Sequence, residues 1–297
     1  IAPKVDELVL FQRTPPWLVP KPDGVINAGV KKLFSFLPAS QNIVRAGIYW
    51  QAEAFALGFV HPKLMVAIEK LARWHLKKQV KDPVLREKLT PNYTIGCKRV
   101  LFSNNYYPAL TRDNVNVIAA GVKEVRANSI IDSNGQEHQV DAIICGTGFD
   151  VKDPLGPLHL YGRDGIETRS KEGGLSAYLG TTLKDLPNLF MLLGPNTALG
   201  HNSIIFMIEQ QIRYAISCLD EMDKRGAAEI SVKPEVQDAY NERIQAELQK
   251  MVWSEGGCKS WYIDEDGKNF TIWPGFTWKY WMRMRKPNFR HFQFKKA

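Results

Sequence analysis

The clearest pattern of apolar and polar positions lies between residues 186 and 216. Residues 189–193 form a short apolar run, typical of a doubly buried strand. A glycine- and proline-containing loop follows at 194–200, and residues 202–203 are N-cap candidates for a helix whose apolar face starts at Ile204. In α/β proteins such a turn can hold an electron-rich ligand group, because free backbone N–H groups and the positive end of the helix dipole point at it. An ordinary βα connection fits the pattern equally well.

The same analysis along the chain predicts an α/β protein with a small antiparallel meander, whose hairpin turn is Asn134-Gly135. The aromatic residues Trp50, Phe55 and Trp74 are expected to lie in a core. Helices are expected over 43–57, 62–76, 204 to near 226, and 234–251, and strands over 5–11, 115–118, 122–125, 129–132, 140–145 and 189–193.

Composition excludes some classes of function. The net charge is +8, but a dense run of Lys and Arg occurs only near the C-terminus, so we expect no nucleic-acid partner. The four cysteines form no CxxC pair, so no metal site is expected. Neither a signal peptide nor a bilayer-spanning apolar run is visible, which favours a cytoplasmic protein. The aromatic, basic tail is expected to pack on the body of the protein, with weak contact to an anionic membrane surface as the alternative.

Candidate chemistry lies at three further places. Arg13 and Thr14 follow the strand predicted at 5–11, where a cation would accommodate a 2′-phosphate and so favour NADPH over NADH. A solvated arginine is an equally good interpretation. Lys98 and Arg99 follow a glycine that lets the backbone approach an anion, although ordinary surface charge is common there. A flexible turn, Gly146-Thr147-Gly148, follows a predicted strand.

Five stretches together resemble one family, the flavin-dependent Baeyer–Villiger monooxygenases within the flavin-containing monooxygenases. The resemblance is greatest to the branch with 4-hydroxyacetophenone and related ketone monooxygenases. The stretches occur in the family's order and are FQRTPPW (11–17), GCKRVLFSNNYYPALTRDNV (96–115), ICGTGFD (144–150), NLFMLLGPNTALGHNS (188–203) and SWYIDEDGKNFTIWPGFTW (260–278).

The resemblance implies a fold with two Rossmann-like dinucleotide-binding domains, one for FAD and one for NADPH, and a helical insertion. By this resemblance, residues 1–38 and 89–120 belong to the NADPH domain and 39–88 to the insertion. Residues 121–230 belong to the FAD domain, and 231–297 form a C-terminal helix and tail. The implied reaction is oxidation of a ketone to an ester or lactone by a flavin peroxide formed with dioxygen.

The resemblance also assigns residues to roles. Arg13, Thr14 and Lys98 match positions that hold the NADPH 2′-phosphate. Arg99 matches the catalytic arginine that keeps the peroxide anionic, a role that suits a fixed guanidinium beside a developing oxyanion. Gly146, Thr147 and Gly148 match the crossover between the nucleotide domains. The residues that match the loop facing the flavin ring are Asn196, Gly200, His201, Asn202 and Ser203.

The chain departs from the family pattern in lacking GxGxxG and the FxGxxxHxxxW/P fingerprint. The missing motifs are all N-terminal ones, so we expect a truncated fragment that alone binds FAD poorly and turns over no ketone. Two alternatives stay open. One is a monooxygenase that hydroxylates nitrogen or sulfur, and the other is a non-catalytic binding remnant.

Overall fold

The computed structural model describes residues 1–148, 158–163, 165, 167, 175–258, 260–264 and 267–296. The chain divides into two compact units. The first unit comprises Ile1–Ile26 and Leu64–Phe149, and the second comprises Asn27–Lys63 and Asp150–Ala297. One boundary between the units therefore falls inside the helical insertion expected at 39–88. The assignment of these segments to an NADPH and an FAD domain stays a prediction.

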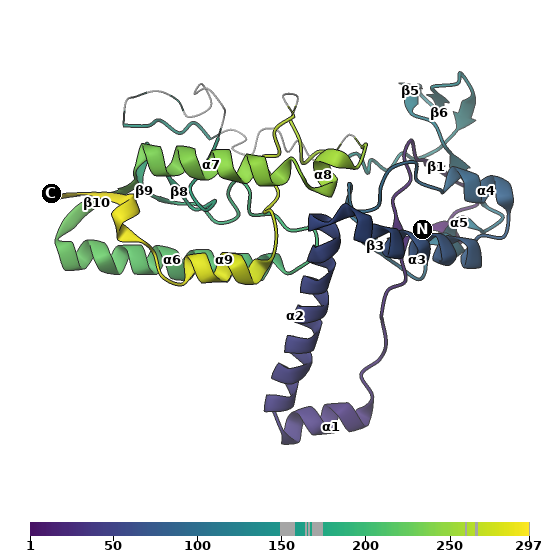
Figure 1. Cartoon of the computed structure of the whole chain (residues 1–297). Coiled ribbons are helices and arrows are strands. Elements are labelled where there is room, and N and C mark those ends of the chain that lie inside the picture. The colour runs from purple at the N-terminus through teal and green to yellow at the C-terminus, as the bar shows by residue number, and fades with distance from the viewer. Residues whose placement is uncertain are drawn as a thin grey trace. The chain divides into compact units, whose positions relative to one another are not determined.

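Short parallel strand pairs and a meander build the first unit (Figure 1). Its strands are β1 (Leu8–Phe11), β2 (Leu18–Val19), β3 (Leu101–Phe102), β4 (Val115–Ile118), β5 (Val122–Val125), β6 (Ser129–Asp132) and β7 (Glu137–Gln139). Its helices are α3 (Met65–Gln79), α4 (Pro83–Lys88) and α5 (Tyr106–Leu110), with a 3₁₀ turn at Ala2–Lys4. Strand β1 pairs in parallel with β4, and β2 pairs in parallel with β3.

The sequence explains how the first unit closes around one apolar core. The buried members of this core are Leu18, Leu76, Val80, Leu89, Tyr107, Leu110 and Val117. They come from β2, α3, the end of α4, α5 and β4, so burial of apolar surface holds the two parallel pairs together. The Asp82 carboxylate caps α4 by accepting the N–H groups of Val84 and Leu85. The strand expected at 115–118 is confirmed, and the one expected at 5–11 is found as β1.

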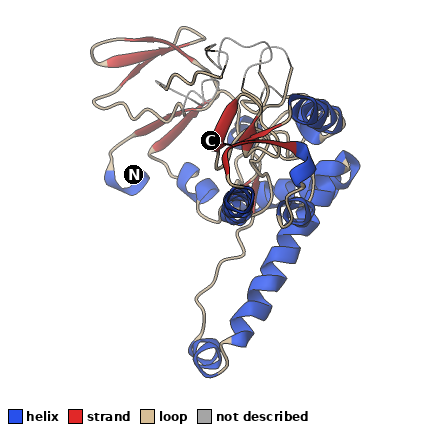
Figure 2. Ribbon diagram, turned by 90° about the vertical axis from the view of Figure 1, so that its left-hand side faces the viewer, coloured by secondary structure: helices blue, strands red, loops and turns tan. Residues whose placement is uncertain are grey.

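The predicted antiparallel meander is confirmed as β5–β6–β7. Strands are drawn in red in Figure 2, and β5 and β6 of the meander are labelled in Figure 1. The prediction of its third strand is wrong, because that strand spans Glu137–Gln139 rather than 140–145. The Gly135 N–H donates to the Asp132 carbonyl, and the Asp132 N–H donates to the Gln136 carbonyl. Pairing therefore resumes directly after the turn, and residues 141–145 lie beyond the sheet in irregular backbone.

The second unit is mainly helical. Its helices are α1 (Ala28–Phe36), α2 (Ala39–Val60), α6 (Ile204–Arg225), α7 (Pro234–Leu248), α8 (Val252–Glu255) and α9 (Thr277–Met284), with 3₁₀ turns at Pro62–Leu64 and Phe289–His291. Its strands are β8 (Thr182–Leu183), β9 (Leu186–Phe190), β10 (Ala227–Val232) and β11 (Phe292–Lys296). In Figure 1 the strands β8, β9 and β10 lie between α7 and α6, and α9 runs beside α6.

Helix α6 organises the second unit. Its start at Ile204 is as expected, and its last residue, Arg225, is followed by the C-cap Gly226, whose φ of 58° is left-handed and suits glycine. The strand before this helix differs from the prediction, because β9 ends at Phe190, is largely half-buried and, within the part of the chain that the structure describes, forms a two-stranded sheet with β8. Leu193 and Asn196 have φ values of 56° and 59°, so extended backbone cannot continue into the turn.

Two expectations about aromatic residues had different outcomes. Trp50 and Trp74 are 58% and 53% exposed, so their prediction as core residues is wrong, and Phe55 is half-buried. The aromatic tail does pack on the second unit, where Trp273, Tyr280 and Phe292 are buried and β11 pairs with β10. Among the residues described, no helix is long and apolar enough to cross a membrane.

Candidate functional site

In the first unit, two loops that carry the predicted cations are held together. Strands β2 and β3 begin directly after these loops, and Trp17 accepts a backbone hydrogen bond from Leu101. The indole N–H of the buried Trp17 donates to the Tyr93 carbonyl over 2.8 Å, and the Tyr93 hydroxyl donates to the Pro15 carbonyl over 3.2 Å. These bonds fix the segment after β1 against the segment before β3.

This arrangement brings Arg13 and Lys98 together. Burial lowers the pKa of Lys98, and the positive charge of Arg13 lowers it further. The Lys98 Nζ lies 5.1 Å from the centre of the Tyr93 ring, while burial raises the pKa of Tyr93 to about 12 and keeps this phenol neutral. Two adjacent cations that repel each other favour the binding of an anion between them.

The other predicted residues of the first unit differ in exposure. Arg99 is exposed next to Lys98, and Thr14 is half-buried next to Arg13. The turn between Ile95 and Cys97 depends on Gly96, whose φ is 94°. Gly146, Thr147 and Gly148 are exposed in irregular backbone, and a Cβ added to either glycine would meet no described atom within 4 Å. The last two residues of the motif ICGTGFD, at 149–150, lie outside the described residues.

In the second unit, the tail segment 269–273 fixes the predicted loop before α6. The Asn196 side chain donates to the carbonyls of Asn269, at 2.7 Å, and Ile272, at 3.2 Å. The Asn196 N–H donates to the Phe270 carbonyl, and Ala198 and Trp273 are joined by a further backbone bond. Asn196 is 3% exposed, so its amide is buried and its hydrogen bonds to the tail segment hold the turn in place.

Glycines let neighbouring segments approach this loop closely. A Cβ on Gly180 would lie 2.1 Å from Thr197 Cγ2 and 2.7 Å from the Pro195 carbonyl oxygen. A Cβ on Gly194 would lie 2.4 Å from the Gly180 carbonyl oxygen, and one on Gly200 would press on Trp253 and Phe59. The loop is therefore a close-packed element whose shape depends on residues without side chains.

A buried polar cluster lies where this loop meets α2 and α9. Glu53, on α2, is 2% exposed. Its carboxylate accepts hydrogen bonds from the Asn202 amide at 2.6 Å, the Thr277 hydroxyl at 2.5 Å and the Thr277 N–H at 3.1 Å. The His201 Nε2 lies 3.4 Å from Glu53 Oε1. Burial would raise the pKa of Glu53, but His201, Thr277 and Asn202 together outweigh burial and lower it below the usual 4.5.

Ser203 is the N-cap residue of α6, as predicted, but its side chain makes no capping bond, and the Asn202 side chain accepts the Ser203 N–H instead. Sequence reasoning missed Glu53 and Thr277. They lie 224 positions apart in the chain, so no local pattern joins them. A usable signal is that Glu53 is the sole acidic residue of the apolar helix α2.

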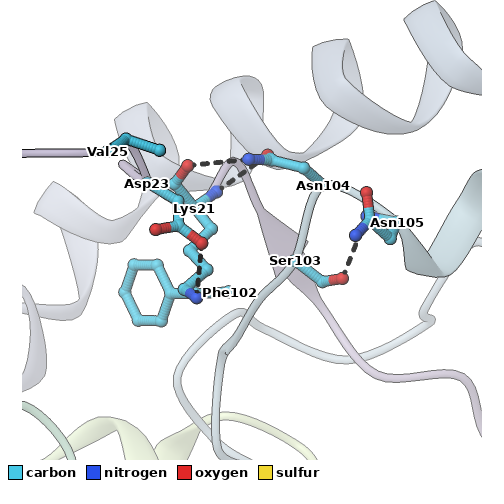
Figure 3. A pocket seen from close by; sticks show the side chains of 8 residues that line it. Lys21, Asp23, Val25, Phe102, Ser103, Asn104 and Asn105 are labelled. Carbon is cyan, nitrogen blue, oxygen red and sulfur yellow. Dashed lines mark hydrogen bonds and ion pairs between the residues drawn. The ribbon is translucent and has the colours of Figure 1, made fainter.

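The first unit also contains a polar pocket of about 570 Å³, lined in part by Lys21, Asp23, Ser103 and Asn104 (Figure 3). Figure 3 shows Lys21 and Asp23 pointing toward each other, in an ion pair of 2.6 Å. Because its cation is already paired, this pocket is a weaker anion site than the Arg13–Lys98 pair. No group of side chains suited to a metal ion occurs among the described residues.

Comparison with known proteins identifies relatives of this chain. It is 50% identical over 285 residues to a Baeyer–Villiger monooxygenase of Pseudomonas aeruginosa, a match that covers 94% of this chain and 54% of that protein. It is 39% identical over 300 residues to a Baeyer–Villiger monooxygenase of Streptomyces coelicolor, covering 99% of this chain and 57% of that protein. The chain thus spans about half the length of these curated relatives. No family model matches it.

Solved structures agree on the fold. A steroid monooxygenase bound to NADP superposes with a TM-score of 0.84 at 21% identity, covering all of this chain and 64% of that one. The protein named OTEMO, in complex with FAD and NADP, gives a TM-score of 0.82 at 22% identity, covering 99% of this chain and 62% of that one.

The fold is therefore a mixed α/β fold that matches part of the structure of NADP-binding monooxygenases. The chain is homologous to two proteins named Baeyer–Villiger monooxygenase and corresponds to about half the length of each.

Proposed function

We propose that this chain forms part of an FAD- and NADPH-dependent monooxygenase that catalyses Baeyer–Villiger oxidation. In this reaction one oxygen atom of dioxygen is inserted next to the carbonyl carbon of a ketone, which gives an ester or a lactone. The observation that carries the proposal is 50% identity across 94% of the chain to a protein with that name. A solved relative by fold binds both FAD and NADP.

The first unit fits the 2′-phosphate of NADPH. Arg13 supplies a planar guanidinium and Lys98 a compact ammonium, and the charge of Arg13 acts on Lys98. A phosphate between them would relieve this repulsion and accept hydrogen bonds from both side chains. Thr14 follows Arg13 directly and adds a hydroxyl donor.

The second unit fits a flavin at the turn from Asn196 to Ser203. This turn leads into α6, a helix of 22 residues whose N-terminus carries positive partial charge. The His201 side chain is 3% exposed and neither of its ring nitrogens has a hydrogen-bond partner among the described residues, so a ligand could complete the cluster. When bound, FAD supplies the oxygen-transfer chemistry and NADPH supplies the hydride.

Arg99 is proposed as the catalytic residue. Its side chain is exposed on the first unit, as suits a group that must reach a ligand from outside the core. A guanidinium keeps its charge at any working pH and would stabilise negative charge that develops on the carbonyl oxygen of the ketone. The exposed turn Gly146–Thr147–Gly148 is proposed as the crossover between the nucleotide-binding regions.

The test is expression of the complete open reading frame that encodes this chain. The purified product should oxidise NADPH in the presence of a panel of ketones and form esters or lactones, measured by mass spectrometry. Arg99→Ala should reduce ester formation by about a hundredfold or more while reduction of the flavin by NADPH continues. Oxidation of amines or sulfides with ester formation absent would favour the nitrogen- or sulfur-hydroxylating alternative.

A second test uses the chain by itself. 2′,5′-ADP should bind more tightly than 5′-AMP, because only the former carries the 2′-phosphate. Lys98→Gln and Arg13→Gln should each weaken 2′,5′-ADP about tenfold and leave 5′-AMP unchanged, measured by calorimetry. Lys123→Gln, an exposed position on β5, is the matched control. Equal affinity for the two nucleotides would contradict this cation assignment.

A further inference from the structure

The acidic residue of α2 connects parts of the second unit that are distant in sequence. Glu53 and Arg45 are the charged side chains of this otherwise uncharged helix. The Glu53 carboxylate contacts the turn before α6 through Asn202 and the first residue of α9 through Thr277. Burying a carboxylate is unfavourable unless donors surround it, so these contacts are what keep Glu53 inside.

The direction of the hydrogen bonds follows from the charge of Glu53. An ionised carboxylate can only accept, so the Thr277 hydroxyl must donate to Glu53. The Tyr49 hydroxyl, 2.9 Å from the Thr277 oxygen, then donates to Thr277. The chain of donors from Tyr49 through Thr277 to Glu53 therefore has one direction, and it joins α2 to the N-terminus of α9.

The charge of Glu53 also determines which ring nitrogen of neutral His201 carries the proton. Its Nε2 lies 3.4 Å from Glu53 Oε1, without hydrogen-bond geometry. Because the carboxylate only accepts, a neutral ring is most stable with its proton on Nε2. Nδ1 then carries a lone pair, is buried, and has no hydrogen-bond partner among the described residues.

We propose that Glu53 is the positioning residue of the turn from Asn196 to Ser203, and that it makes His201 Nδ1 a hydrogen-bond acceptor for a ligand. The ligand group must be a donor, either a hydroxyl or an N–H. Phe59 and Trp253 stack at 5.0 Å between ring centres, and Phe59 lies 6.0 Å from the His201 ring, so apolar ring surface lies beside the imidazole. That the ligand is a flavin rests on the proposed function.

The first experiment measures the His201 ring in the full chain by ¹⁵N NMR. We expect the Nε2–H tautomer in the unmodified chain and a mixture of tautomers in Glu53→Gln, because the glutamine amide can both donate and accept. Glu221→Gln, which removes a negative charge elsewhere in the second unit, should change nothing. A proton on Nδ1 in the unmodified chain, in either the Nδ1–H tautomer or the doubly protonated ring, would overturn the proposal even if the variant failed to fold.

The second experiment titrates FAD into the product of the complete open reading frame. Glu53→Gln should weaken FAD binding about tenfold, and Glu221→Gln should not. Unchanged FAD affinity in Glu53→Gln would refute the positioning role. Failure of the unmodified protein to bind FAD would instead contradict the proposed function, while the NMR measurement would still decide the tautomer.

Discussion

The two units build their candidate sites in opposite ways. In the first unit, Arg13 and Arg99 are exposed and Lys98 is half-buried. The candidate site there consists mainly of positively charged side chains. In the second unit, Asn196 and Glu53 are at most 3% exposed, and their polar atoms are committed to other parts of the same unit. We therefore expect the first candidate site to attract a ligand by charge, and the second to recognise a group that fits a fixed arrangement.

The largest difference is expected in thiol chemistry. Cys145 of the first unit is free and exposed, and Cys218 of the second is free and buried, with its pKa raised by burial to about 12. At pH 8 that value leaves about one thiolate in 10⁴, so Cys145 should react with a thiol reagent about a thousandfold faster. Labelling of Cys145→Ser and Cys218→Ser variants, followed by mass spectrometry, checks this. Equal rates would show that the second unit opens readily.

The close packing of the second unit can be tested at Gly180. Its φ is 63°, and an added Cβ would strike Thr197 and the Pro195 carbonyl, so Gly180→Ala should lower the free energy of unfolding by about 3 kcal/mol. Gly226 has a similar φ of 58° with open space around it. Gly226→Ala is therefore the control and should cost about 1 kcal/mol. Equal losses in denaturant melts would mean that backbone strain alone matters at both positions.

The next largest difference between the two sites is expected in their response to salt concentration. Raising NaCl from about 50 to about 200 mM should weaken 2′,5′-ADP binding about tenfold, because the cations that hold it are near solvent. The unfolding free energy of the second unit should change far less over this range, because the Glu53 carboxylate is buried and hydrogen-bonded to Asn202 and Thr277. Calorimetry and denaturant melts at both salt concentrations provide the measurement. A salt-independent affinity for 2′,5′-ADP would contradict a charge-based site.

The smallest expected effect is that of pH on the second unit. The folded pKa of Glu53 lies below its ordinary value of 4.5, so the folded state favours the charged form. This contribution to stability is present above about pH 4.5 and is lost as the pH falls through the folded pKa. Glu53→Gln should therefore have a flatter dependence of unfolding free energy on pH below about 4.5 than the unmodified chain. Parallel curves would contradict the lowered pKa.

Local features of this fold could be predicted from sequence, and long-range ones could not. The start of α6 at Ile204 and its end at Gly226 follow from spacing and capping chemistry, which act within a few residues. The exposure of Trp50 could not be predicted in this way, because helical spacing does not show which face of a helix packs against another element. The contact of Glu53 with Thr277 depends on how α2, α6 and α9 pack, and no spacing in the sequence encodes it.

The attachment of the turn at Asn196 to the segment 269–273 has a consequence for biosynthesis. Every residue of the first unit has been synthesised once residue 149 is made. The turn, in contrast, cannot take its final shape until residues 269–273 have emerged from the ribosome, because the carbonyls of Asn269 and Ile272 accept the hydrogen bonds of Asn196. During translation the polar groups of the second unit therefore stay in water while the first unit can already close.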